Sequence, residues 1–109
     1  MILGAFGNLR STSASRFLCN FTTTNGSHYV VAGRFANSLP PFRASGAFLI
    51  YEKEEDLGGV KTFNGVVGCD EICLEFGHGD EHNLKIEGSL DTPMCPAISV
   101  CGSLFFTQS

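Results

Sequence analysis

The length of the apolar runs constrains this chain more than any other feature. The runs are short, they alternate between apolar and polar residues, and Gly, Pro or Asn interrupts them. A two-residue period is typical of β-strands with one buried face, whereas an amphipathic helix repeats its apolar residues every three or four positions. Residues 52–56 are the one segment compatible with a helical turn. The pattern predicts eight strands, near residues 2–7, 16–23, 28–36, 42–51, 60–67, 71–76, 83–90 and 97–107.

The length and composition predict one domain with a real core. The chain has 109 residues, of which 43% are hydrophobic and 17% are charged. A typical soluble domain has about 25% charged residues, so disorder is disfavoured. No run reaches the roughly 18 apolar residues of a membrane helix, and we expect no membrane partner. We expect a single β domain over residues 1–109, with half-repeats at 1–55 and 56–109. About eight antiparallel strands favour a small barrel, with a two-sheet β-sandwich as the alternative.

Matched glycines indicate an internal duplication. A shift of 55 residues places Gly33 on Gly88, and a shift of 56 places Gly46 on Gly102, with apolar residues matching around both pairs. Strict alternation puts all four glycines on the apolar face, where glycine often marks a barrel corner or a close approach. The sequence therefore predicts pseudo-twofold symmetry and inward glycines that leave interior volume. In the strand at 42–51, alternation assigns these residues to the inward face: Phe42, Ala44, Gly46, Phe48 and Ile50.

Charge is divided unevenly along the chain. Residues 1–51 carry four arginines and no acid, whereas residues 52–109 carry three lysines and all eleven acids, so 3 − 11 = −8. The net charge of −4 disfavours a nucleic-acid surface, and we expect no nucleic acid as partner. Guanidinium forks match carboxylate and phosphate groups, although rim salt bridges to Asp70, Glu71 and Asp91 are the plainer interpretation. The candidate ligand-binding residues are Arg10, Arg16, Arg34 and Arg43.

The order of the strands decides where these residues meet. If the strands follow one another up and down around the barrel, all four arginines lie toward one end. The histidines, including His28, and most acids then lie toward the other end. A Greek-key order would scatter both groups. On the up-and-down order, replacing Arg34 and Arg43 together should weaken the binding of an anionic ligand.

A His-rich stretch is the candidate metal site. Imidazole and carboxylate groups can bind a divalent metal, and a loop would let three of them converge. Cys69 and Cys73 cannot complete the set, because an extended chain holds them too far apart. A solvated polar turn is the plainer interpretation, and histidine acid–base chemistry is the third. The candidate metal ligands, for a possible divalent ion and no other cofactor, are His78, Asp80 and His82.

The cysteines and the first residues bear on the redox setting. Five cysteines fit a complete disulfide framework poorly, and the chain start lacks the basic and apolar regions of a signal peptide. We therefore favour a reducing, cytoplasmic setting, which earlier removal of a signal peptide would reverse. Alternation predicts a buried Cys19, with Cys73 and Cys101 on the other face.

Three function classes remain open, because no nucleotide-binding or catalytic signature is present. The first is a non-enzymatic module that binds a small anionic or aromatic ligand at a barrel mouth or subunit interface. The second is a structural or assembly subunit of a coat, tail or filament. The third is a small barrel enzyme, such as a cyclase, isomerase or hydrolase, that uses histidine. We favour the first, with a small anionic ligand or self-association as partner, and we expect a homo-oligomer.

Overall fold

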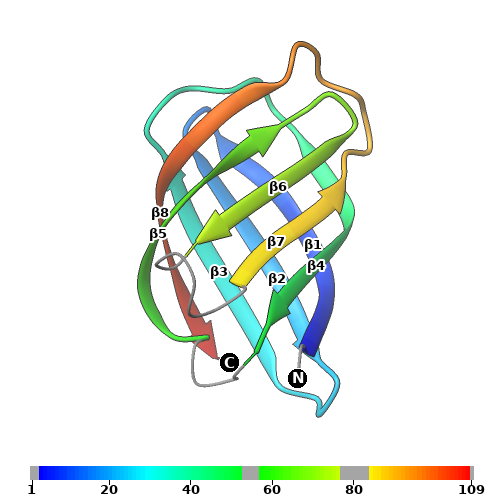
Figure 1. Ribbon diagram of the computed structural model, residues 1–109, viewed down its shortest axis with the longest axis vertical. Helices are drawn as coiled ribbons and strands as arrows, with labels where there is room; N and C mark the ends of the chain where they lie inside the picture. Colours follow the sequence, from blue (N-terminus) through cyan, green and yellow to red (C-terminus); the bar gives the residue numbers. More distant parts are fainter. Residues whose placement is uncertain (1–2, 53–56, 77–83, 109) are drawn as a thin grey trace.

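The protein is a closed barrel of eight antiparallel strands (Figure 1). The computed structural model describes residues 3–52, 57–76 and 84–108. Within these residues there is no helix that could cross a membrane. The all-β prediction is confirmed, and the barrel is confirmed over the sandwich. The strands are β1 (Leu3–Ser13), β2 (Arg16–Thr23), β3 (His28–Phe35), β4 (Arg43–Tyr51), β5 (Gly59–Val67), β6 (Glu71–Phe76), β7 (Leu84–Ser89) and β8 (Ile98–Gln108).

Each half of the chain forms a Greek key. Strand β4 returns to pair with β1, and β8 returns to pair with β5, so the order around the barrel is β1-β2-β3-β8-β5-β6-β7-β4. The up-and-down order expected above is wrong. The connections at residues 36–42 and 90–97 are long enough to cross the barrel end, whereas residues 14–15 suffice only for a hairpin (Figure 1).

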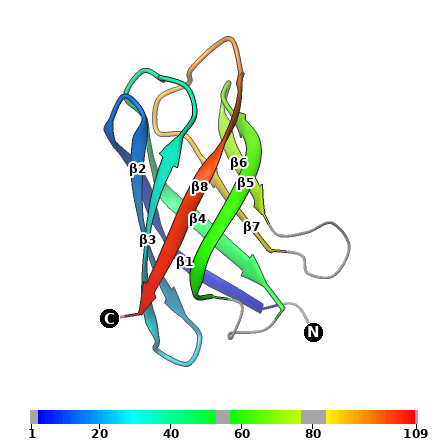
Figure 2. The ribbon, with the colours of Figure 1, turned by 90° about the vertical axis from the view of Figure 1, so that its left-hand side faces the viewer.

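The Greek-key order does not scatter the loops. Every neighbouring pair of strands is antiparallel, so consecutive strands still alternate in direction. The loops at 14–15, 36–42, 68–70 and 90–97 therefore share one end, at the top of Figure 1. The hairpin at residues 24–27 lies at the other end (Figure 2). We call the first the arginine end.

A β-bulge in β4 changes which residues face the core. Gly7 pairs with Ala47 and Leu9 with Ala44, so two residues of β4 lie opposite one residue of β1. Such an insertion shifts the alternation by one residue. Phe48 is consequently 46% exposed, while Leu49 is fully buried. The inward assignments of Gly46, Phe48 and Ile50 are wrong, and those of Phe42 and Ala44 are confirmed.

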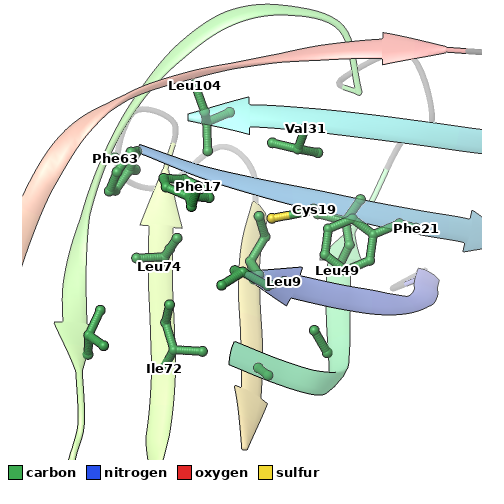
Figure 3. Close-up of a cluster of buried hydrophobic side chains, with 14 of the residues drawn as sticks. Leu9, Phe17, Cys19, Phe21, Val31, Leu49, Phe63, Ile72, Leu74 and Leu104 are labelled. Carbon is green, nitrogen blue, oxygen red and sulfur yellow. The ribbon is translucent and has the colours of Figure 1, made fainter. Parts of the chain in front are cut away.

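Aromatic and aliphatic side chains pack inside the barrel (Figure 3). Gly33 lies directly opposite Phe17, and a Cβ atom at Gly33 would lie 2.1 Å from the phenyl ring. The missing side chain is thus replaced by the Phe17 ring, which also packs on Phe35 at 4.8 Å between ring centroids. At this position the inward glycine admits an aromatic ring, so the expectation of interior volume there is wrong.

The two halves share one topology. The orders β4-β1-β2-β3 and β8-β5-β6-β7 are equivalent, as an internal duplication requires. The matched glycines Gly46 and Gly102 differ in burial, because Gly46 is exposed at the bulge whereas Gly102 is half-buried on β8. The duplication itself stays a prediction.

The cysteines divide into one disulfide and three thiols. Cys69 and Cys95 are bonded, which joins the β5–β6 connection to the β7–β8 connection at the arginine end. Cys19 is buried, as predicted, and burial raises the pKa of its thiol. Burial also raises the pKa of Cys73, which is half-buried, and Cys101 is exposed.

Candidate functional site: two arginine grooves

The four arginines lie on one side of the barrel. Strands β4, β1, β2 and β3 are consecutive around the wall, and no acid occurs among residues 1–51. All four arginine side chains are exposed on the outer surface. Each arginine lies in the part of its strand that is nearer the arginine end. The wall is therefore cationic over these four strands, while the described strand acids lie on β6 and β7.

Pairing across strands groups the arginines in twos. Arg10 lies directly opposite Arg43 across β1 and β4, and Arg16 lies directly opposite Arg34 across β2 and β3. Like charges at directly opposed positions destabilise a sheet. Among residues 3–52, 57–76 and 84–108, no carboxylate lies within salt-bridge distance of any of the four guanidinium groups. An anionic ligand would relieve this repulsion.

The first pair lines a groove at the arginine end. Its volume is about 630 Å³. Arg10 and Arg43 contribute the cationic wall, and the other walls come from the two long connections, which are rich in proline. The remaining lining residues are Ser11, Pro40, Pro41, Phe42, Asp91, Thr92, Pro93 and Met94.

Hydrogen bonds fix both connections that form this groove. The Phe42 N–H donates to Ser11 Oγ at 2.9 Å, and the Ser11 N–H donates to the Phe42 carbonyl at 3.0 Å. On the other wall, the Asp91 N–H donates to the Arg43 carbonyl at 2.8 Å. The Met94 N–H donates to the Cys69 carbonyl at 2.7 Å, beside the disulfide. The groove is thus preorganised by the backbone.

Asp91 is the one acid among the described residues that line the first groove. Its carboxylate accepts hydrogen bonds from the Ser45 hydroxyl and from the Ser45 N–H, the latter at 3.0 Å. These bonds hold the pKa of Asp91 below its ordinary value, and the nearby Arg43 lowers it further. The carboxylate stays ionised and is directed at Ser45, which leaves both guanidinium groups without a salt bridge to it.

The second pair lines a different groove, of about 510 Å³. Here Arg16 and Arg34 lie beside an exposed apolar pair, because Val60 and Phe105 are directly opposite across β5 and β8. Val60 is 77% exposed and Phe105 is 49% exposed. This groove therefore combines cationic and apolar groups, whereas the first combines cationic and polar ones.

The predicted four-arginine cluster is thus two pairs, each with its own groove. Arg34 and Arg43, expected to act together, lie in different grooves because β4 pairs with β1 and not with β3. The sequence predicted Asp91 near the arginines as a salt-bridge partner, and the structure places it in the first groove, hydrogen-bonded to Ser45. Sequence reasoning missed the apolar wall of Val60 and Phe105. Alternation alone predicts that Val60 and Phe105 face outward. Their position beside Arg34 follows only from the pairing of β3 with β8.

The predicted metal site falls outside the described residues, since His78, Asp80 and His82 lie within 77–83. Across the residues that the structure does describe, no group of three potential ligands is placed to hold a metal ion. His28 is half-buried on β3, where its Nδ1 atom lies 3.4 Å from Thr22 Oγ1.

Comparison with known proteins adds no family to this description. The chain matches no protein-family model, and neither the curated proteins nor the solved structures gave a significant match.

Proposed function

We propose that the protein is a non-enzymatic binding module that holds a small polar anion in the groove of Arg10 and Arg43. The observation that carries this proposal is the pair itself: two directly opposed arginines, on one wall of a groove, with no salt bridge among the described residues. A phosphate or carboxylate could accept from both forks, which removes the repulsion between them.

The surroundings of the pair support a small polar ligand over an apolar one. Ser11, Thr92 and Asp91 offer hydroxyl and carboxylate groups to a ligand that also carries hydroxyls. The proline-rich walls are already fixed by backbone hydrogen bonds, so little entropy is lost when the ligand binds.

Titration of ¹⁵N-labelled protein with inorganic phosphate and with citrate tests the proposal. We expect amide shifts around residues 40–43 and 91–94 that saturate with the anion. Replacing Arg43 by alanine should weaken binding by about tenfold or more, since a hydrogen bond to a charged group contributes roughly 1.5–3 kcal/mol.

Arg16→Ala is the matched control, because it removes an arginine that is also exposed, from the other groove. An equal loss of phosphate affinity in Arg16→Ala and Arg43→Ala would indicate general charge attraction and not a site. Flat titrations with both anions would contradict the proposal for these two ligand classes. Native mass spectrometry of freshly purified protein would show a ligand carried from the host as extra mass.

A further inference from the structure

The groove of Arg16 and Arg34 differs in chemistry from the first groove and is not used by the proposed function. It lies on strands β2, β3, β8 and β5, which are consecutive around the barrel. Arg34 lies opposite Ser103 of β8, and Phe105 is two residues further along the same strand. Adjacent strands are about 4.8 Å apart, and two residues along a strand span about 6.6 Å. One ligand with a short hydrocarbon chain could therefore reach from the Arg34 guanidinium group to the Phe105 ring.

The apolar wall of this groove is exposed on the barrel surface. Val60 is the most exposed of the large hydrophobic residues described, and it lies directly opposite Phe105. Ala32 lies opposite Phe105 on the other side, which extends the apolar strip toward the arginine-bearing strands. An apolar strip ending at two cations is complementary to a molecule with an apolar body and an anionic head.

We propose that this groove is a second binding site, for a free amphipathic carboxylate with one acyl chain or one aromatic ring. The carboxylate would accept hydrogen bonds from Arg16 and Arg34, whose forks match its two oxygens. The chain or ring would lie along Ala32, Phe105 and Val60. A single hydrocarbon chain fits better than a lipid surface, because the strip lies on a curved wall and has only two large apolar side chains.

Decanoate, below its micelle concentration, is the probe, with acetate and decyltrimethylammonium as its matched partners. We expect decanoate to bind at least about tenfold more tightly than acetate, since the chain buries apolar surface. Its amide shifts should centre on residues 32–34, 60 and 103–105. The cationic partner should bind far more weakly, because its head group faces two arginines.

Variants of the groove test separately how the carboxylate and the apolar part of the ligand contribute to binding. Phe105→Ser should weaken decanoate by about threefold to tenfold and leave acetate unchanged, since a half-exposed ring contributes only part of a buried one. Arg34→Ala should weaken both anions. The matched controls are Phe48→Ser, a similarly exposed phenyl elsewhere on the wall, and Arg43→Ala in the first groove, both read by the decanoate shifts at residues 32–34, 60 and 103–105. Val60→Ser serves as a second variant if Phe105→Ser fails to fold.

The inference is overturned if Phe48→Ser weakens decanoate as much as Phe105→Ser, or if decyltrimethylammonium binds equally well. Binding to phosphatidylglycerol vesicles without binding to free decanoate would also overturn it, in favour of a membrane surface. Its failure leaves the proposed function intact, because phosphate and citrate are read at residues 40–43 and 91–94.

Discussion

The two Greek keys have the same strand order, but their outer surfaces differ in charge. Strands β1–β4 carry four outward arginines and no acid, whereas β6 and β7 carry glutamates, one of which pairs with Lys85 at 3.8 Å. The N-terminal key has a bulge in its fourth strand, and the C-terminal key has the disulfide. One topology therefore tolerates two surfaces, because the inward residues close the barrel and the outward residues are free to vary.

The largest difference between the keys is expected at Phe48 and Leu104, which the predicted duplication, with its shift of 56 residues, would place at equivalent positions. Leu104 is buried, so Leu104→Ala should lower the free energy of unfolding by about 2–5 kcal/mol. Phe48 is half-exposed and packs mainly on Phe6, with ring centroids 4.6 Å apart, so Phe48→Ala should cost about 0.5–1.5 kcal/mol. Urea unfolding measures both, and equal losses would contradict the bulge.

The disulfide gives the second difference. It links residues 26 apart in sequence, and replacing both Cys69 and Cys95 by serine should lower the free energy of unfolding by about 2–4 kcal/mol. The same variant should weaken phosphate binding in the first groove, because Met94 lies beside Cys95 in its wall. Cys101→Ser is the control, since this exposed thiol is free. An unchanged urea midpoint in the double variant would show that the bond does not stabilise the fold.

Gly33 and Gly88, which the shift of 55 residues matches, differ in their surroundings in the two keys. Gly33→Ala forces a Cβ atom to within 2.1 Å of the Phe17 ring and should cost about 1–3 kcal/mol. At Gly88 the nearest atom to a new Cβ is the Gly46 carbonyl oxygen at 3.0 Å, so Gly88→Ala should cost less. Thermal unfolding compares the two, and a larger loss at Gly88 would contradict the packing described for Phe17.

The smallest expected effect concerns Asp91, where the C-terminal key touches the N-terminal one. Hydrogen bonds from Ser45 lower its pKa, so its contribution to stability is present above the unfolded-state pKa and is lost as the pH falls through the lower folded-state value. Ser45→Ala should raise the pKa of Asp91 toward its ordinary value, as measured by NMR titration of its carboxyl carbon. Thr92→Ala, in the same groove, is the control. An unchanged pKa in Ser45→Ala would show that the hydrogen bond from the Ser45 hydroxyl is absent in solution.

The sequence predicted the strands well and their partners poorly. All eight strands fall near the predicted ranges, since alternation and Gly or Pro breaks act locally. The order around the barrel could not be predicted, because antiparallel neighbours on either side satisfy the same alternation. The bulge at Ser45 and Gly46 was also missed, because an inserted residue leaves no local pattern that distinguishes Phe48 from an inward phenylalanine.

The candidate site shows the same division. Periodicity and antiparallel alternation suffice to predict the strand positions, the alternating strand directions and the position of the four arginines toward one end. The pairing of Arg10 with Arg43 and of Arg16 with Arg34, and the position of Phe105 beside the second pair, follow from the strand order of the folded barrel. The pairing of the strands depends on how the two long connections cross the barrel end. That crossing depends on the packing of the whole core and not on any one segment.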